Sequence, residues 1–397
     1  MSSPSSVPDQ VALEGLTVLV ANPSPDVYGS DLQMLETLSA VVAAGGRAVV
    51  ALPQDGPLVG MIHERGAEVD VVDFPVVRRA NKSVIAFARL GASAAAAVPR
   101  LVTYLRRTRP DVVYVNTVTL PWWLLAARLT RTPAVCHVHE AENADSMVVR
   151  RLLVTPLRLA DALLVISRSA MGALTDVDAG LRVKANLVYN GVPGPPDDPE
   201  PAPRRSPLRL ITVGRLSPRK APHLALEALA ALRSEGHDIT LEVAGSVYPG
   251  YEWYETQLRE RSAKPDLVGA VTFPGYCKPI WPHLARADVV VQPSLREPFG
   301  NAVVEAQLSL RPVVATSALG HLESIEDGRT GLLVPPDDVA AMTAAIKRLV
   351  EDPTLACSLA QAARVHALEH FSTTRYGREV VDLLAGLARR RRAVLTA

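Results

Sequence analysis

Two groups of charged residues in this chain have the types and spacing to bind a phosphorylated sugar. Arg215 and Lys220 follow a short apolar run that ends at Gly214, and Glu297 and Glu305 flank the start of a helix-like run. Arginine and lysine form strong charge-assisted hydrogen bonds with phosphate, and carboxylates accept hydrogen bonds from hydroxyl groups. The combination predicts a pocket that holds a diphosphate at one end and sugar hydroxyls at the other.

Each motif has a less specific interpretation when it is taken alone. Arg215 and Lys220 by themselves are typical of a solvated loop, and a pair of glutamates at this spacing is typical of an exposed helix face. The run between the glutamates is more specific, because Gly300 allows the backbone to approach a ligand closely. A helix from about Asn301 then offers its first amides, at Gly300, Asn301 and Ala302, to phosphate. We therefore interpret the motifs together, as one site.

Short runs rich in β-branched residues alternate with helical patterns along the whole chain. This alternation predicts parallel βαβ units and hence an α/β fold. In the first half the predicted strands are Leu16–Ala21, Ala48–Leu52, Val69–Asp73, Val112–Asn116, Ala134–His139, Ala162–Ser167 and Asn186–Tyr189. In the second half they are Leu208–Val213, Thr240–Ala244, Val271–Phe273, Val289–Gln292, Val313–Ala315 and Gly331–Val334. The last predicted helices lie near Thr354–His370 and Thr373–Arg392.

A proline-rich segment divides the chain. Residues 193–207 contain seven prolines and few apolar side chains, which predicts an interdomain linker. The predicted fold is a pair of Rossmann-like, doubly wound domains that face each other across a cleft, 1–192 and 208–371. A C-terminal helix with a basic tail, 372–397, follows and is free to cross back to the first domain. In such sheets, ligands bind beyond the carboxyl ends of the strands.

Composition and charge argue against several classes of protein. The 397 residues are 48% hydrophobic and 21% charged, and a net charge of +1 lacks the basic excess of a nucleic-acid-binding protein. The three cysteines are odd in number and far apart, which argues against a disulfide framework and favours a reducing, cytoplasmic location. Neither a signal peptide nor an apolar run of membrane-spanning length is visible, so we expect any membrane contact to be peripheral.

The first half carries its own candidates for ligand contact. Gly29 begins the first predicted helix, whose amides could face a phosphate, although a capped helix start explains the same pattern. Strand alternation puts His137 and His139 on one face, with Glu140 at the carboxyl end. A metal site on these histidines is disfavoured, since Cys136 points to the other face and further ligands are not evident. For His137 a position in the core is the stronger interpretation.

A long segment, 288-DVVVQPSLREPFGNAVVEAQLSLRPVVATSALGHLESIEDGRTGLLVPPDD-338, resembles the donor-binding segment of the retaining glycosyltransferases of family 4 (group 1), which have the GT-B fold. The resemblance implies transfer of a sugar from a nucleoside-diphosphate sugar to an acceptor hydroxyl, with retention at the anomeric carbon and without a metal or other cofactor. It also implies that the first domain binds the acceptor and the second the nucleotide sugar. The implied contacts are His139 and Glu297 for the transferred sugar; Arg215, Lys220, Gly29, Gly300, Asn301 and Ala302 for the diphosphate; Glu305 for the ribose; and Tyr276 and Cys277 for the base.

The chain departs from the family pattern at a few positions. Leu310 stands where the family usually has glycine, and Gln307 stands at a common methionine position. Both follow the phosphate contacts, so we expect altered packing and intact binding. Asp176-Val177-Asp178 looks like the metal motif of the other glycosyltransferase fold, but it follows a helix of the first domain and is interpreted as a chance match.

One segment of the first half is strongly basic. Residues 74–110 contain eight basic and no acidic residues, and apolar residues lie between the basic ones. This pattern suggests peripheral contact with anionic lipid, which would bring the enzyme to a lipid-linked acceptor at the inner face of the cell membrane. An ordinary solvated helix face explains the pattern equally well. Four arginines at 389–392 could assist.

Other functions share the same alternation of strands and helices. A nicotinamide-dependent dehydrogenase is disfavoured, because a GxGxxG motif is missing after the first strand of either half. A sugar-nucleotide epimerase or a phosphorylase would share the cleft between two domains. A non-catalytic sugar-nucleotide sensor would keep the donor-binding loop, and only the presence of both Glu297 and His139 argues against it. The envelope glycolipid or polysaccharide that such an enzyme would build is not specified by the sequence.

Overall fold

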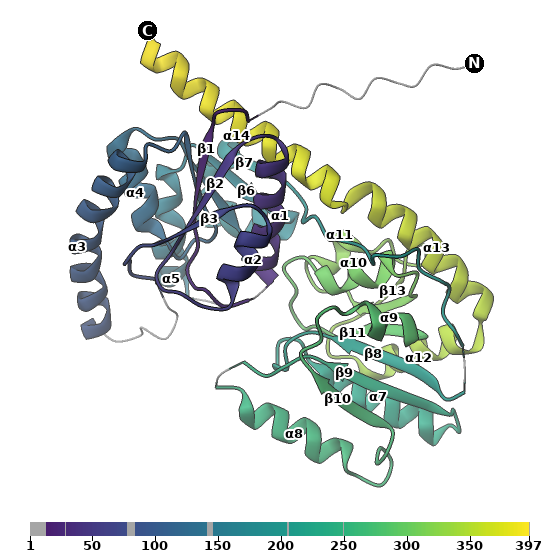
Figure 1. Cartoon of the computed structure of the whole chain (residues 1–397). Coiled ribbons are helices and arrows are strands. Elements are labelled where there is room, and N and C mark those ends of the chain that lie inside the picture. Colours follow the sequence, from purple (N-terminus) through teal and green to yellow (C-terminus); the bar gives the residue numbers. More distant parts are fainter. Residues whose placement is uncertain are drawn as a thin grey trace, which may run out of the picture. The chain divides into compact units, whose positions relative to one another are not determined.

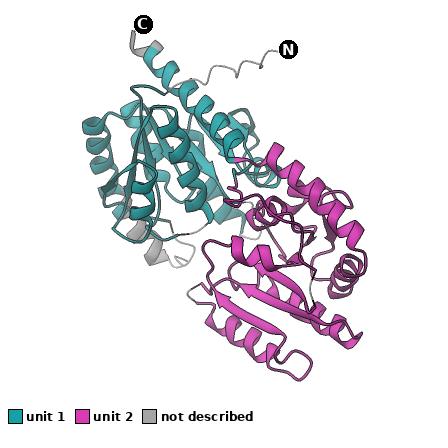
Figure 2. Ribbon diagram, turned by 45° about the vertical axis from the view of Figure 1, so that its right-hand side comes forward, with its two compact units in different colours: residues 1–191, 373–397 teal, residues 192–372 magenta. Residues whose placement is uncertain are grey.

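The computed structural model describes residues 13–27, 29–77, 84–140, 146–204, 206–248 and 250–396. It divides into two compact units, which we describe separately (Figure 2). Unit 1 comprises Met1–Gly191 and Thr373–Ala397, and unit 2 comprises Val192–Ser372. Within the described ranges, each helix is too short or too polar to cross a membrane.

Unit 1 is a parallel sheet with helices packed against it (Figure 1). Its strands are β1 (Thr17–Ala21), β2 (Arg47–Leu52), β3 (Glu68–Val71), β4 (Val112–Val115), β5 (Ala134–Val138), β6 (Ala162–Val165) and β7 (Ala185–Leu187). Its helices are α1 (Gly29–Ala43), α2 (Leu58–Glu64), α3 (Val84–Thr108), α4 (Pro121–Thr130), α5 (Met147–Val154), α6 (Arg168–Thr175) and α14 (Thr373–Thr396), with 3-10 turns η1 (Thr155–Leu159) and η2 (Ala179–Lys184).

Unit 2 repeats this plan with a second parallel sheet. Its strands are β8 (Leu208–Val213), β9 (Ile239–Ala244), β10 (Val271–Gly275), β11 (Val289–Gln292), β12 (Val313–Thr316) and β13 (Leu332–Val334). Its helices are α7 (Pro222–Ser234), α8 (Glu252–Ser262), α9 (Trp281–Arg286), α10 (Asn301–Leu308), α11 (His321–Ser324), α12 (Val339–Glu351) and α13 (Pro353–His370).

The strand order of each sheet shows where its direction of winding reverses. They are β3-β2-β1-β4-β5-β6-β7 in unit 1 and β10-β9-β8-β11-β12-β13 in unit 2. The direction of winding therefore reverses between β1 and β4 in one unit and between β8 and β11 in the other. Ligands of doubly wound sheets bind at such reversals, outside the carboxyl ends of the strands. The predicted fold class, with two Rossmann-like units, is confirmed.

The predicted strands are all present, with differences at their ends. Asn116 and His139, expected as the last residues of strands, lie one position beyond β4 and β5. The side chains of these two residues form a hydrogen bond with each other. Both strands therefore end one residue before the predicted position.

The last helix, α14, completes the core of unit 1. Tyr376, Val380, Leu384 and Leu387 recur at helical spacing and are buried with residues of α1 and of the sheet. The hydroxyl groups of Tyr376 and Thr37 are 2.6 Å apart. The C-terminal helix thus returns to the first Rossmann-like unit, as the sequence allowed, and lies beside α1 (Figure 1).

The proline-rich segment 193–207 belongs to unit 2 and is fixed to it. Arg311 is fully buried, and its guanidinium donates to the backbone carbonyls of Ser309, Ala287 and Glu200. Because carbonyl oxygens surround the cation, its burial is compensated by hydrogen bonds. In this part of the chain the prolines therefore run along the surface of unit 2 and are not a free spacer.

Leu310 adopts a left-handed conformation, with φ of +53°. This conformation costs an ordinary L-residue roughly 1–2 kcal/mol and costs glycine almost nothing. Leu310, which stands where the family usually has glycine, therefore strains the backbone locally just after α10. Its neighbour Arg311 provides the buried hydrogen bonds that keep the turn in place.

The ends of β8 and β9 approach so closely that one position there must be glycine. A Cβ atom on Gly245 would lie 1.8 Å from the carbonyl oxygen of Gly214, and Gly245 has a φ of +156°. We expect Gly245→Ala to lower the free energy of unfolding of unit 2 by about 3 kcal/mol, through backbone collision and strain. Gly236→Ala is the matched control, because Gly236 also has a positive φ, of +92°, but has open space around it. Chemical denaturation of both variants measures the difference, and equal losses would contradict this account.

Candidate functional site

The carboxyl ends of β8 and β11 carry the predicted charged groups of unit 2. After β8 the chain passes through Gly214 and Arg215 and makes a turn that ends at Lys220, where the Lys220 amide donates to the Ser217 carbonyl. The loop after β11 is tied to this turn, because Leu295 N–H donates to the Arg219 carbonyl over 2.9 Å. Two segments far apart in the sequence are thus held side by side.

Lys220 and Glu297 form an ion pair at this edge. The Lys220 Nζ lies 2.5 Å from Glu297 Oε2, and the two side chains are 19% and 9% exposed. Ser294 Oγ donates a second hydrogen bond to the same carboxylate oxygen over 3.3 Å. The carbon stem of Lys220 packs over Gly214, whose missing side chain leaves room for it. The structure brings together two residues that the sequence analysis assigned to different ends of the ligand.

The surroundings keep Glu297 ionised. Burial acts to raise the pKa of this carboxyl, but the positive charges of Lys220 and Arg219, together with the hydrogen bond from Lys220, outweigh burial and lower the pKa to about 2. Glu297 is therefore a fixed negative charge that can accept hydrogen bonds from hydroxyl groups. Arg219 was not singled out from the sequence, although it is part of the same basic cluster.

Arg215 takes a different position from Lys220. Its guanidinium lies 5.6 Å from the ring centre of Tyr248, which follows the neighbouring strand β9. Cations at this distance from an aromatic face are attracted by its electrons. The two loops are further joined where Leu216 and Val247 pair as an isolated bridge. Arg215 is thus positioned by Tyr248, a partner that the sequence did not indicate.

Helix α10 begins at Asn301, as predicted. Its N-cap residue, Gly300, has a φ of +106° and makes no side-chain cap. The amides of Val303 and Val304 both bond to the Gly300 carbonyl, so the first turn is closed by the backbone. The start of α10 therefore presents backbone N–H groups and the positive end of the helix dipole beside Glu297.

Glu305, one turn further along α10, has the opposite electrostatic environment from Glu297. Burial raises the pKa of this carboxyl to about 7, and Lys220 offsets burial only in part. Tyr276, after β10, is exposed, and Glu305 helps to raise the pKa of its hydroxyl, so the two are electrostatic neighbours. Cys277 is half-buried and its thiol donates to the Gly275 carbonyl. The residue predicted for the ribose thus lies within α10, and those predicted for the base directly follow β10.

In unit 1, His139, which was predicted to contact the transferred sugar, ends a chain of buried hydrogen bonds. Its Nε2 lies 3.1 Å from Asn116 Oδ1, Asn116 donates to Asn22 Oδ1, and Asn22 donates to Asp31 Oδ1 over 2.9 Å. Since each amide nitrogen donates, Nε2 of His139 must carry the proton and leave Nδ1 as an acceptor. Burial lowers the pKa of His139 to about 3, so the ring is neutral. The sequence did not indicate that Asn22 and Asn116 orient His139. Asn22 directly follows β1 and Asn116 directly follows β4, the two strands at the reversal point.

The other candidates in unit 1 have structural partners. His137 is fully buried, and its Nδ1 lies 2.5 Å from the Tyr114 hydroxyl, which agrees with a core position. Glu140 accepts from Thr117 Oγ1 and from the His139 amide. Gly29 begins α1, as predicted, in open space.

The described residues contain no cluster of three or more side chains suited to a metal ion. Asp178, from the Asp-x-Asp motif, caps η2 by accepting from the Gly180 amide and pairs with Arg158. Asp176 ends α6. The motif therefore has a structural explanation in the turn between a helix and a 3-10 turn.

Comparison with known proteins identifies the family. The family profile described as "Glycosyl transferases group 1" matches residues 207–352, and the profile described as "Glycosyl transferase 4-like domain" matches residues 29–191. The chain belongs to the group 1 glycosyltransferases. Both matches include the edges described above, with Glu297 and Glu305 in the first and His139 in the second.

Curated relatives of this glycosyltransferase chain match parts of it. Glycogen synthase of Mycobacterium tuberculosis (strain ATCC 25618 / H37Rv) is 30% identical over 285 residues, which is 67% of this chain and 66% of the relative. D-inositol 3-phosphate glycosyltransferase of Salinispora arenicola is 36% identical over 161 residues, 39% of this chain and 36% of the relative. The chain thus spans less than two thirds of the length of these relatives.

Solved structures share the fold over nearly the whole chain. HepE of Anabaena, crystallised in complex with UDP, has a TM-score of 0.80 at 23% identity and covers 94% of this chain and 100% of its own. Sucrose-phosphate synthase of Thermosynechococcus elongatus has a TM-score of 0.73 at 19% identity, over 96% and 100%. Both support the GT-B fold of this family member.

The raised pKa of Glu305 predicts a pH-dependent stability. The pKa is about 7 in the folded chain against an ordinary value of 4.5, so between these values the folded state holds a proton that the unfolded state has released. The contribution of Glu305 to stability is therefore greatest below about pH 4.5 and is lost as the pH rises to about 7. We expect Glu305→Gln to gain stability relative to the parent over this interval, measured by thermal unfolding at a series of pH values. A difference that is the same at every pH would contradict the assignment.

Proposed function

We propose that this chain transfers a sugar from a nucleoside-diphosphate sugar to an acceptor hydroxyl, with retention at the anomeric carbon. The observation that carries the proposal is the Lys220–Glu297 ion pair beside the start of α10. This arrangement supplies positive charge and backbone N–H groups for a diphosphate and an ionised carboxylate for sugar hydroxyls within one edge of unit 2. The relatives, a glycogen synthase and a D-inositol 3-phosphate glycosyltransferase, support the same class of reaction.

In the proposed reaction, the bond between the anomeric carbon and the phosphate oxygen breaks, and the acceptor oxygen bonds to that carbon on the same face. The acceptor's proton passes to the departing phosphate. Arg215, Lys220 and the amides at Gly300, Asn301 and Ala302 balance the charge that develops on the diphosphate. This charge balance takes the role that a metal ion has in other sugar transferases.

The remaining roles in the proposal are those that the family resemblance implies. Glu297 accepts from hydroxyls of the transferred sugar, and the neutral His139 ring contacts the sugar through its Nδ1. Glu305 accepts from the ribose, while Tyr276 and Cys277 contact the base with their backbone. Gly29, at the start of α1, lets that helix approach the diphosphate.

Removal of a phosphate-binding charge tests the proposed site. We expect Arg215→Ala and Lys220→Ala each to reduce turnover more than tenfold, because each ~1.4 kcal/mol of lost transition-state stabilisation is a factor of ten. Arg215→Lys is the matched control for charge. Thermal unfolding must be recorded for Lys220→Ala, since the variant leaves Glu297 buried without its cation. Near-parental kinetics in both alanine variants would disprove the assignment.

The donor and the reaction class are identified by two further measurements. A thermal-shift panel of UDP-, GDP- and dTDP-sugars with their nucleoside diphosphates selects the base, and the uridine nucleotide of the HepE complex makes UDP the first choice. Product analysis then separates the alternatives. A transferase releases the free nucleoside diphosphate, an epimerase retains the nucleotide sugar, a phosphorylase consumes phosphate, and a sensor releases no product.

We also propose that the basic segment 74–110 brings the enzyme to anionic lipid at the inner face of the membrane, where a lipid-linked acceptor for glycolipid or polysaccharide synthesis would be available. Arg78, Arg79 and Lys82 lie outside the described residues, as does the side chain of Arg89. Four exposed cations support the idea: Arg100, Arg106 and Arg107 in the described part of α3, and Arg109 directly after it.

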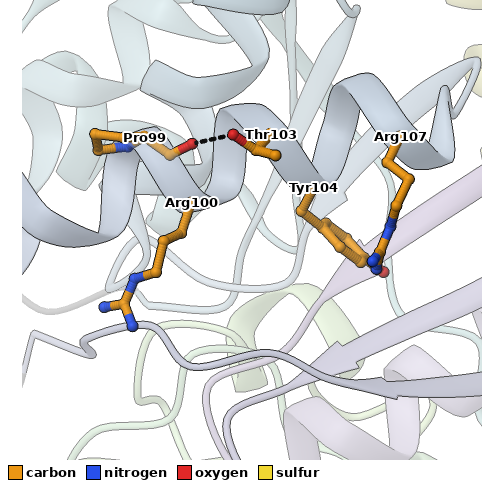
Figure 3. Close-up of a pocket in the computed structure, with 5 residues that line it drawn as sticks. All are labelled: Pro99, Arg100, Thr103, Tyr104 and Arg107. Carbon is orange, nitrogen blue, oxygen red and sulfur yellow. Dashed lines mark hydrogen bonds between the residues drawn. The ribbon is translucent and has the colours of Figure 1, made fainter.

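The exposed side of α3 has a defined local structure. Figure 3 shows Arg100, Tyr104 and Arg107 extending from one side of the helix, around a hollow that Thr103 also lines. Arg100 pairs with Asp73 at 2.7 Å, and the Arg107 guanidinium lies 5.7 Å from the Tyr104 ring centre. Tyr104 itself is buried and its hydroxyl donates to Asp70, so the exposed arginines are the part of this surface that suits an anionic membrane.

A vesicle-binding experiment tests the lipid contact. Each exposed arginine contributes about 1 kcal/mol at an anionic surface, so the double variant Arg106→Gln/Arg107→Gln loses about 2 kcal/mol and should bind phosphatidylglycerol vesicles roughly thirtyfold more weakly. Arg128→Gln/Arg131→Gln removes two exposed cations at the end of α4 and is the matched control. Sedimentation with phosphatidylglycerol and with phosphatidylcholine vesicles measures binding. Equal partitioning onto both kinds of vesicle would refute the contact.

A further inference from the structure

A histidine that the sequence analysis did not single out lies against the Glu297 loop. His321 begins the short helix α11, after β12, and Gly320 before it packs flush on the loop backbone. The Gly320 amide donates to the Glu297 carbonyl over 2.8 Å. A Cβ atom on Gly320 would lie 2.4 Å from Phe299 Cα, so the two backbones touch.

The imidazole ring of His321 has a fixed orientation. Only 1% of the residue is exposed, and Nδ1 lies 3.0 Å from the carbonyl oxygen of Thr316. A carbonyl oxygen can only accept, so Nδ1 carries the proton and Nε2 keeps a lone pair in the neutral ring. The Thr316 hydroxyl in turn donates to the Ser294 carbonyl, at the other end of the loop that contains Glu297. Hydrogen bonds through the end of β12 thus connect His321 with that loop.

The edge of the ring fills the space that Gly300 leaves open. A Cβ atom built on Gly300 would lie 2.8 Å from Cδ2 of His321, 3.3 Å from its Nε2 and 3.6 Å from Cγ of Glu297. Three groups therefore meet at the point where the loop passes into α10. A larger side chain at position 321 would displace the stem of Glu297, because the Gly300 backbone is held by the hydrogen bonds that its carbonyl accepts from the Val303 and Val304 amides.

The charges around the ring keep it neutral. Burial lowers the pKa of His321 to about 4, the Glu297 carboxylate acts to raise it, and the Lys220 ammonium lowers it. At neutral pH the ring adds no charge to the Lys220–Glu297 pair. His321 supports this pair by packing and through its hydrogen bond with the Thr316 carbonyl, and the positive charge of the pair comes from Lys220.

We propose that His321 is a positioning residue for the sugar end of the donor site: it holds the loop Glu297–Gly300 so that Glu297 faces the transferred sugar. The inference rests on the proposed function and adds a residue to it. Because His321 acts through Glu297, it should affect sugar transfer without affecting the binding of a nucleoside diphosphate that carries no sugar.

Variants at His321 and Glu297 test this role. His321→Phe keeps a flat ring and loses the hydrogen bond to Thr316, and His321→Asn keeps an N–H donor close to the Nδ1 position. We expect kcat of His321→Phe to fall at least tenfold, with His321→Asn closer to the parent. Affinity for the nucleoside diphosphate selected by the panel, measured by calorimetry, should stay within twofold in both. His237→Phe is the control, since His237 is a partly buried histidine just before β9, at the amino edge of the sheet.

A double-mutant cycle decides whether His321 acts through Glu297. We expect the double variant His321→Phe/Glu297→Gln to be no slower than Glu297→Gln, because the second change removes the group that the first one positions. Additive losses in kcat would overturn the proposal. So would a His321→Phe variant whose affinity for the nucleoside diphosphate falls by the same factor as its kcat. If Glu297→Gln itself keeps parental turnover, or no nucleotide binds, the proposed function fails and not this inference alone.

Discussion

The buried ion pair between Lys220 and Glu297 is the interaction on which the candidate site depends. A carboxylate with so little exposure is stable only when a cation and hydrogen bonds compensate for lost water. Lys220 and Ser294 provide both, and the connection between the loops after β8 and β11 keeps them in reach. The same cation influences Glu305 much less, so two glutamates of neighbouring segments differ in pKa, about 2 against about 7. One is a permanent charge and the other is able to bind a proton near neutral pH.

The two units hold the side chains at their carboxyl edges in place by different interactions. In unit 2 the carboxyl edge is organised by charge, and close backbone contacts at Gly245 and Gly320 bring the loops together. In unit 1 the reversal point is organised by neutral amides, because Asn22 and Asn116 pass hydrogen bonds from His139 to Asp31. Because the hydrogen bonds of these amides can be donated in one direction only, they fix the tautomer of His139 while its ring stays neutral. Both arrangements fix a functional group before any ligand is present.

Much of the fold was predictable because buried parallel strands appear as apolar β-branched runs whatever their surroundings. Val289–Gln292 and Leu208–Val213 have the same bounds in the structure as in the prediction. The start of α10 was predictable because a glycine precedes a helical pattern. Contacts between segments were harder to predict: His321 and Tyr248 have no local motif, and only the order of strands brings them beside Glu297 and Arg215. The proline-rich segment was interpreted from composition as an interdomain linker, and its hydrogen bond with Arg311, far along the chain, could not be predicted from composition.

The return of α14 to the first sheet has a consequence for how the chain is made. Unit 1 buries Tyr376, Val380 and Leu384 together with residues that are synthesised first. While the ribosome is still translating unit 2, the apolar residues of unit 1 that α14 later covers remain exposed. Unit 2 can therefore complete its folding before unit 1 does. Chaperones that shield such residues would engage the early half for longer, and a C-terminal nonsense mutation would damage the half of the protein encoded at the opposite end of the gene.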